Sequence, residues 1–240
     1  VQLHSHNFYE LLYCRKANGA EYLVGSDRYK LQRGDLIFVA PRVSHCPILP
    51  PTMSGSYVRD VLWISEELFS SIAEKYGLNL DGSAEATMLR TAGTRWEYLG
   101  QLFSTGIEET IQQNFGWEMA VVANTMTILV HLMRANDDAY SKPLLAEKPD
   151  LLDQVLAYVE HHLAEKITLA DVARHFFISE STVTQTFRKK MGVSFYRCVT
   201  QRRLIAAKAL IEKGNAMESV AEQVGFSDYS SFFRAFKQEY

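Results

Sequence analysis

The sequence has little of what marks an exported, membrane-spanning or disulfide-linked protein. Its 240 residues include three cysteines, Cys14, Cys46 and Cys198, which form no Cys-x-x-Cys pair and leave an odd thiol in any disulfide scheme. That usage favours a reducing compartment. No window approaches the roughly 18 to 20 uncharged apolar residues of a membrane span, and the start, VQLHSHNFYE, lacks the basic-then-apolar grading of a signal peptide. We expect a cytoplasmic protein without a membrane partner.

The chain also has no strong excess of either charge, because 25 Lys and Arg stand against 28 Asp and Glu, for a net charge of -3. Taken alone, this balance argues weakly against a nucleic-acid partner. The segment from Ser181 to Ile211 departs from the average, since it holds basic residues and no acid: Arg188, Lys189, Lys190, Arg197, Arg202, Arg203 and Lys208. Such a run is either a solvated helical face or a surface for a polyanion.

A hydrophobic content of 47% is enough for two modest cores. Up to residue 65, aromatic and β-branched segments alternate with turn residues, which predicts the short strands of an antiparallel barrel. Beyond it the pattern predicts helices over 65–77, 94–115 and 117–134, then a charged, proline-containing linker, then helices from Leu151. We therefore predict an α+β fold with two domains, divided into a barrel (1–80), a helical pair (81–136), a linker (137–149) and an all-α domain (150–240).

The helix expected over 117–134, WEMAVVANTMTILVHLMR, is apolar around much of its circumference. Packing against the barrel would bury one stripe of this helix, and the rest needs another cover. The helix over 94–115 and a second copy of the chain serve this purpose equally well. The second alternative predicts that the helical pair is the interface of a homodimer.

The last third of the chain contains an internal repeat. Residues 172–189, VARHFFISESTVTQTFRK, match residues 220–237, VAEQVGFSDYSSFFRAFK, in the opening Val-Ala, the serine at the eighth position and the closing aromatic-basic pair. Each copy offers a short helix, a turn, a capping residue (Ser179; Ser227 or Asp228) and a second helix with a polar outer face, which are the parts of a helix-turn-helix. Two ordinary solvated hairpins are the alternative, but two copies joined by a basic helix favour binding to double-stranded DNA.

The polar faces of the two second helices supply the candidate contacts, because small polar side chains, Gln and Arg suit base edges, and flanking Lys and Arg suit phosphates. The predicted base-facing residues are Ser181, Thr184, Gln185, Tyr229, Ser230, Ser231 and Arg234, and the predicted phosphate contacts are Arg188, Lys189, Lys190, Arg202, Arg203 and Lys237. The joining helix, 196–213, is expected to bury a stripe that begins at Tyr196. Arg203 falls within that stripe, so a carboxylate or a backbone carbonyl is the alternative to a phosphate as its partner.

The second copy and the helix before it follow a known pattern of residues. RLIAAKALI (203–211) and then VAEQVGFSDYSSFFRAFK resemble the AraC/XylS family of bacterial transcription regulators nearly throughout, with conservative departures at Ile211 and Val220. The resemblance covers residues 150–240 and implies that the outward residues named above face bases. Because the family pattern continues for a further segment, we expect the last helix of the domain to lie beyond Tyr240.

A cluster of histidines lies near the N-terminus. Alternation with period two puts His4, His6 and Glu10 on one face of a strand, together with Phe8, Leu12 and Cys14, and the segment GDLIFVAPRVSH adds His45. This arrangement resembles the cupin barrel, whose metal-binding members use a His-x-His-x3-Glu motif and a later His. Through the resemblance, His4, His6, Glu10 and His45 are a candidate metal set. The alternative function is then a metal-dependent cupin enzyme with an appended DNA-binding domain.

The chain departs from the catalytic cupin pattern, because Gly19 follows Glu10 late and Pro41-Arg-Val-Ser-His45 differs from Pro-x-Gly-x-x-His. Resemblance to the sensor domains of AraC/XylS regulators, which usually bind a sugar or a related metabolite, accounts for the same residues without catalysis. We expect no enzyme, no catalytic residue, no cofactor and no bound metal, but a small-molecule effector, a carbohydrate, that alters the spacing of two DNA-binding domains in the dimer. The candidate effector-binding residues are His6, Glu10, Tyr22, His45, Tyr57, Arg59 and Trp63, although a register error of one residue would turn them outward.

Overall fold

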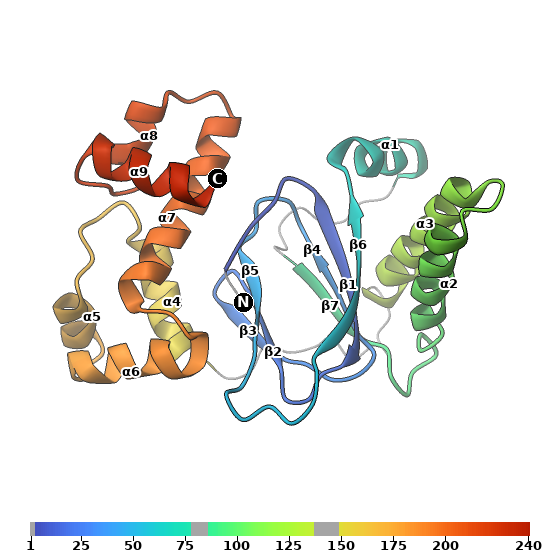
Figure 1. Ribbon diagram of the computed structural model, residues 1–240, viewed down its shortest axis with the longest axis horizontal. Helices are drawn as coiled ribbons and strands as arrows, with labels where there is room; N and C mark the ends of the chain where they lie inside the picture. The colour runs from blue at the N-terminus through green and yellow to red at the C-terminus, as the bar shows by residue number, and fades with distance from the viewer. Residues whose placement is uncertain (1–2, 78–85, 137–148) are drawn as a thin grey trace.

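The computed structural model describes residues 3–77, 86–136 and 149–240 (Figure 1). The first two stretches form a β-domain with flanking helices, and the third forms an all-α C-terminal domain. The strands are β1 (Tyr9–Lys16), β2 (Glu21–Val24), β3 (Asp27–Lys30), β4 (Asp35–Val39), β5 (His45–Ile48), β6 (Val58–Ile64) and β7 (Ala86–Arg90). The helices are α1 (Glu66–Tyr76), α2 (Leu99–Gln112), α3 (Trp117–Asn136), α4 (Leu151–His161), α5 (Leu169–His175), α6 (Glu180–Met191), α7 (Phe195–Glu212), α8 (Met217–Gln223) and α9 (Tyr229–Glu239).

Two antiparallel sheets build the β-domain, one in the order β6-β1-β4-β7 and the other in the order β3-β2-β5. A bridge between His4 and His45 extends the β5 edge of the smaller sheet. Because side chains alternate along a strand, Leu12 and Cys14 of β1 enter the core between the sheets, whereas Leu11 and Tyr13 point to the other side. The α+β fold class, with an antiparallel β-domain ahead of a helical domain, is confirmed.

Helices α1, α2 and α3 cover the outer face of the larger sheet. Phe103 of α2 and Leu132 of α3 share a core with Tyr13 of β1 and Phe38 of β4. Ser65 caps α1 by accepting a hydrogen bond from the Leu68 N–H, and Gly77 ends it at a φ of 63°, as the sequence predicts. Helix α2 begins at Leu99 instead of residue 94, because the preceding residues form turns in which the Thr94 hydroxyl donates to the Thr91 carbonyl.

The C-terminal domain covers the outer face of the smaller sheet, so the helices of the two domains lie on opposite sides of the strands (Figure 1). Leu23 of β2 and Cys46 and Ile48 of β5 share one buried cluster with Val155 of α4 and Phe195 of α7. Leu3, just before the bridging His4, belongs to the same cluster. The molecule therefore has four layers, and the smaller sheet is the layer that contacts both the β-domain core and the C-terminal domain.

Strands β1 to β6 lie in the region up to residue 65 where the sequence predicts strands, whereas β7 lies beyond it. Strand β7 pairs with β4, so the β-domain continues past the boundary predicted at residue 80. The linker predicted at 137–149 lies outside the described residues except for Pro149. None of the helices within 3–77, 86–136 and 149–240 is long and apolar enough to cross a membrane.

Candidate DNA-binding surface and effector pocket

Helices α5 and α6 form the first helix-turn-helix unit. Thr168 and Asp171 make a reciprocal capping box at the start of α5, and the Ser179 hydroxyl accepts from the Thr182 N–H at 3.1 Å to start α6. Val183 and Phe187 are fully buried, which fixes the rotation of α6 about its axis. Ser181 and Gln185 are consequently exposed on its outer face, while Thr184 is half-buried and donates to the Glu180 carbonyl at 3.0 Å.

Helices α8 and α9 form the second unit at the other end of α7 (Figure 1). Of the two caps that the sequence allows, Asp228 is the one used, because its carboxylate accepts from the Ser231 N–H at 2.7 Å. Phe232 is buried and orients α9. Tyr229, Ser230 and Arg234 are exposed as predicted, and Ser231 is half-buried.

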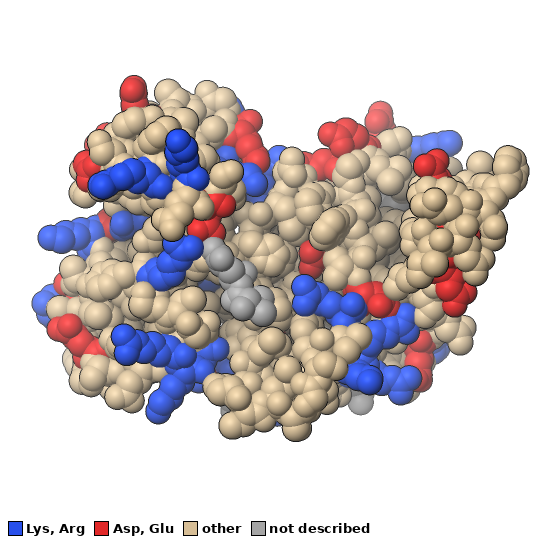
Figure 2. Space-filling model, viewed as in Figure 1, with Lys and Arg blue, Asp and Glu red and all other residues tan. Residues whose placement is uncertain are grey.

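Basic side chains surround both units. Figure 2 shows Lys and Arg gathered over the C-terminal domain, near α6 and again near α8 and α9, with another group at the lower edge of the β-domain. Arg188, Lys189 and Lys237, all predicted phosphate contacts, are exposed. Their charges therefore stand on the same domain as the exposed polar faces of α6 and α9.

The other three predicted phosphate contacts are engaged within the protein. The Arg202 side chain is 1% exposed and donates to Glu160 and to the Gly25 carbonyl, so a phosphate cannot reach it in this arrangement. Arg203 donates to the Leu163 and Glu165 carbonyls, which is the alternative that its place in the apolar stripe allowed. Lys190 is paired with Asp150. The sequence does not reveal the partners of Arg202 and Lys190, because these partners lie far away in the chain.

The expected stripe of α7 also needs a correction. Tyr196 is 50% exposed, and its hydroxyl accepts a hydrogen bond from the Leu169 N–H at 3.3 Å, so it does not belong to the buried face. Its neighbours Phe195 and Cys198 are buried instead. The stripe is rotated because this end of α7 packs on both α6 and the β-domain.

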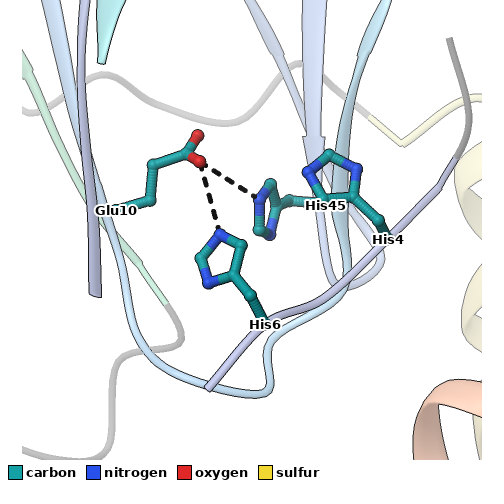
Figure 3. Close-up of side chains that lie close together, drawn as sticks. All are labelled: His4, His6, Glu10 and His45. Atoms are coloured by element: carbon teal, nitrogen blue, oxygen red, sulfur yellow. Dashed lines mark hydrogen bonds and ion pairs between the residues drawn. The ribbon is translucent and has the colours of Figure 1, made fainter. Parts of the chain in front are cut away.

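Within the β-domain, two of the candidate effector residues, His6 and His45, point toward the Glu10 carboxylate (Figure 3). Its carboxylate lies 3.3 Å from His6 Nε2 and 3.9 Å from His45 Nε2, and it accepts from Trp63 Nε1 at 3.2 Å. The Tyr22 hydroxyl donates to its other oxygen at 3.1 Å, from the opposite sheet. The register predicted by alternation is therefore the one observed for Glu10.

The histidine rings present their Nε2 atoms to this carboxylate. The Nδ1 atoms of His6 and His45 lie 2.8 Å and 2.9 Å from the Phe8 and Val43 carbonyls, contacts that hold a proton on Nδ1. A neutral imidazole has one ring proton, so His6 cannot donate to both Phe8 and Glu10. The contact between His6 Nε2 and the Glu10 carboxylate is satisfied if His6 is an imidazolium or if a cation lies between these two groups. His45 Nε2 is buried and, among the described residues, has no hydrogen-bond partner.

His4 completes a cluster of four metal-ligating side chains. One ligand atom from each of His4, His6, Glu10 and His45 lies within 4.8 Å of the others. Burial alone raises the pKa of Glu10, but the hydrogen bond with His6 and the proximity of His45 outweigh it and lower the pKa to about 2. Burial lowers the pKa of His45 to about 4. The carboxylate is thus ionised and the buried imidazole neutral at pH 7, the forms that bind a metal ion.

Aromatic side chains line the approach to Glu10. Trp63 is 67% exposed although it pairs with Glu10 across β1 and β6, so this side of the Glu10 cluster is open to solvent. Arg59 lies over the Tyr57 ring at 5.3 Å. Phe8 was not among the effector-binding residues predicted from the sequence. Its ring stacks on the His6 ring with 3.8 Å between the centroids and lies 5.3 Å from the Trp63 ring centroid. Its place in the same alternating series as His6 and Glu10 was the signal for including it.

The two helical units define the chain as a two-domain helix-turn-helix protein. A model of a helix-turn-helix domain matches residues 172–240. Together with the signature residues 203–211 and 220–237, this match shows that the C-terminal domain is a helix-turn-helix domain of the AraC/XylS type.

Several known proteins are similar to this chain in sequence. Regulatory protein PocR from Salmonella typhimurium is 31% identical over 90 residues, which cover 37% of this chain and 30% of PocR. The HTH-type transcriptional activator RhaS from Salmonella arizonae is 24% identical over 241 residues, covering 99% of this chain and 84% of RhaS. The chain spans 39% of the length of LumQ from Photobacterium leiognathi. An apo ToxT structure from Vibrio cholerae aligns with 99% of this chain and 87% of its own at 16% identity, with a TM-score of 0.40.

Proposed function

We propose that this protein is a transcription regulator that binds double-stranded DNA through α6 and α9. The observation that carries the proposal is that each helix has a buried aromatic anchor, Phe187 or Phe232, and an exposed polar face on the opposite side. Small polar side chains and Arg at these positions suit base edges in the major groove. Helix α7 joins the two units and would present α6 and α9 to neighbouring segments of the groove.

The test is selection from a random duplex library with the full chain. We expect the protein to enrich a common sequence and to bind it at least about 1,000-fold more tightly than random duplex at physiological salt. Replacement of Gln185 and Arg234 by Ala should remove the enrichment, whereas replacement of the equally exposed Gln223 should not. A chain that enriches nothing and binds all duplexes alike would lack the proposed function.

We further propose that the cluster of polar and aromatic side chains around Glu10 is a cupin-like sensor site for a small polar effector, of which a sugar is the class that the family resemblance favours. Trp63 and Tyr57 offer apolar faces, while Glu10 and Arg59 offer directed polar groups, a combination suited to hydroxyl-rich ligands. A thermal-shift screen of sugars tests this, with Trp63→Ala expected to abolish any stabilisation. The family relatives named above are regulators, which favours binding over turnover.

A second candidate for the same site is a divalent transition metal, favoured by the four ligand atoms within 4.8 Å of one another. Three imidazoles and one carboxylate form a donor set of borderline character that suits Zn²⁺ and its neighbours in the first row. His45 Nε2, buried and lacking a hydrogen-bond partner within the described part of the chain, fits this group because an ion would satisfy it. Elemental analysis after dialysis against Zn²⁺ should give about one ion per chain. His6→Ala should lose it, and His161→Ala, on α4, should keep it.

We also propose that α2 and α3 form the interface of a homodimer. Ile107, Ile111 and Met119 are exposed on these helices, next to a groove that Val61, Leu102 and Val121 help to line. Contiguous exposed apolar side chains of this kind mark interaction sites on soluble proteins.

A further inference from the structure

The turn between α5 and α6 holds an aromatic residue in an unfavourable backbone conformation. The Ile178 N–H donates to the Ala173 carbonyl at 2.9 Å, and the Phe177 N–H donates to the Arg174 carbonyl at 3.4 Å, which is the Schellman ending of a helix. Phe177 has a φ of 55°, in the left-handed region. A bulky side chain is uncommon there because its Cβ crowds the backbone oxygen, and glycine usually takes this position.

The second unit makes the same turn with the residue that this geometry favours. The Phe226 N–H donates to the Ala221 carbonyl at 2.9 Å, and Gly225 has a φ of 85°. Phe177 and Gly225 are both the sixth residue of their copy of the internal repeat. The first unit therefore carries a phenyl ring at a position where the second unit has none.

The Phe177 ring gains nothing from packing that would offset this strain. Phe177 is 96% exposed, whereas its neighbours Phe176 and Ile178 are half-buried and pack against the core of the C-terminal domain. Burial of an aromatic ring stabilises a fold, and this ring is not buried. Backbone strain that a fold retains without such a gain is typical of a functional position.

Phe177 lies beside the start of α6, the part of a recognition helix that contacts base edges. It precedes the N-cap residue Ser179 by two positions, so the two Cα atoms are at most about 7.6 Å apart. The exposed Ser181 is in the first turn of α6, with its hydroxyl 2.7 Å from that of Ser179. Met191, at the other end of α6, packs on the cluster that includes β-domain residues. Figure 1 shows α5, which leads into this turn, on the side of the domain away from the strands.

The chemistry of the side chain determines which part of a base it can recognise. A phenyl ring offers no conventional hydrogen bond, and the apolar group that base pairs present in the major groove is the C5 methyl of thymine. The exposed Ser181 and Gln185 of α6 suit the hydrogen-bonding edges of bases instead. Phe177 therefore adds an apolar group that these two side chains lack.

We propose that Phe177 is a further DNA-contacting residue, which recognises the C5 methyl of one thymine at the edge of the site bound by α6. The inference rests on the DNA-binding function proposed above and adds a preference for thymine to it. The left-handed turn directs the ring out of the domain beside the first turn of α6. Covering one methyl group removes it from water, which raises affinity about fourfold.

The test uses the duplex that the full-length wild type selects from a random library. Each enriched thymine is replaced in turn by deoxyuridine, which removes only the C5 methyl, and affinity is measured by fluorescence anisotropy. At one position per bound chain, the replacement should weaken wild-type binding about fourfold. Phe177→Gly should bind the thymine duplex about fourfold more weakly than wild type. The same deoxyuridine replacement should cause this variant no further loss.

Two controls separate the contact from an effect on folding. Gly and Asn both tolerate the left-handed conformation, so Phe177→Gly and Phe177→Asn should have thermal midpoints equal to or above that of wild type. Lower midpoints for both would show that the ring stabilises the domain and would overturn the proposal. Tyr76→Ala removes an aromatic side chain that is 56% exposed on α1. This variant should bind both duplexes as wild type does, and an equal loss in it would refute the assignment to Phe177.

The remaining outcomes distinguish the contact from the function on which it rests. A wild type that selects no sequence and binds no duplex even at low salt would overturn the DNA-binding function and the thymine contact with it. If the wild type selects a sequence and Phe177→Gly binds it equally well, the contact alone is overturned and the exposed ring is left for a protein partner. A Phe177→Gly variant that still loses fourfold at every deoxyuridine to which wild type responds would likewise refute the contact.

Discussion

His45 and Cys46 are neighbours in β5, yet their side chains lie on opposite faces of the smaller sheet. His45 points to Glu10, with its Nε2 3.9 Å from the carboxylate, whereas Cys46 lies in the cluster shared with the C-terminal domain. His4 and Leu3 repeat this division, since His4 joins the histidine cluster and Leu3 joins the interdomain cluster. A ligand that draws His4 and His45 together would therefore move two residues of the docking surface directly.

The three native cysteines can be used to measure whether the β-domain and the C-terminal domain remain in contact. Burial raises the pKa of Cys14 and of Cys46 to about 12 and also raises the pKa of Cys198, so all three are neutral thiols at pH 7. Thiolates are the species that alkylating reagents attack, and we expect the folded wild type to label slowly with iodoacetamide. Arg28 of β3 pairs with two carboxylates at the start of α4, so Arg28→Ala should label faster at Cys46 and Cys198, which lie in the interdomain cluster. Peptide mapping by mass spectrometry measures each site.

Cys14 is the internal control for this labelling, because it lies in the core between the two sheets and away from the interface. Separation of the two domains should leave Cys14 protected from alkylation. Equal acceleration at all three cysteines would mean global unfolding, and an unchanged rate at Cys46 would show that the domains stay docked without Arg28.

The roles assigned to bases and phosphates predict different losses. Arg234→Ala on α9 should weaken binding to the selected sequence by about 1 to 3 kcal/mol and relax specificity at one position. Lys189→Ala should weaken binding to all duplexes alike and lower the salt slope by about one. Anisotropy titrations on selected and scrambled duplexes at several salt concentrations separate the two. Equal losses on both duplexes for both variants would contradict the assignment.

Alanine substitutions at two glycines distinguish the energetic cost of backbone strain from that of a steric clash near the second helix-turn-helix unit. Gly225 has a φ of +85°, and an added Cβ would lie 2.3 Å from the Leu163 carbonyl oxygen. Gly214 has a φ of +88°, and an added Cβ would meet nothing within 4 Å. Ala at either site costs about 1 kcal/mol for the left-handed conformation, and Gly225→Ala must also displace the 163–165 turn. In urea unfolding, Gly225→Ala should have a lower midpoint concentration than Gly214→Ala. Equal midpoints would refute the close approach of Gly225 to the Leu163 carbonyl.

Association through α2 and α3 predicts a dimer that a single charge disrupts. Ile111 is 75% exposed and Met119 is 77% exposed. Ile111→Glu or Met119→Glu should shift the wild-type dimer to monomer in sedimentation velocity at micromolar concentration, because a buried unpaired carboxylate is costly. Tyr76→Glu on α1, at a side chain that is 56% exposed, should have no effect. A monomeric wild type would rule out the interface.

Most of the correct predictions came from residues that lie close together in the sequence. The capping role of Ser179 and the alternation that turns Glu10 inward depend on neighbours within a few positions, and both were predicted correctly. Strand β3 gives a weak signal in the sequence because its buried residue, Arg28, is charged, and Arg28 finds its partners Asp150 and Asp153 more than a hundred positions later. The burial of Arg202 could not be predicted for the same reason, since one of its partners is the distant Gly25 carbonyl. A single sequence shows which face a residue takes, but not which distant domain will cover that face.

The capping box of α4 forms entirely within the C-terminal domain. Asp150 accepts from the Leu152 and Asp153 amides within α4 itself, and Asp153 accepts from the Asp150 amide in return. These bonds need nothing from the β-domain, so Arg28 can depart while the first turn of α4 stays intact. A C-terminal domain that left the sheet would therefore expose the Asp153 carboxylate, while Asp150 would keep its ion pair with Lys190 of the same domain.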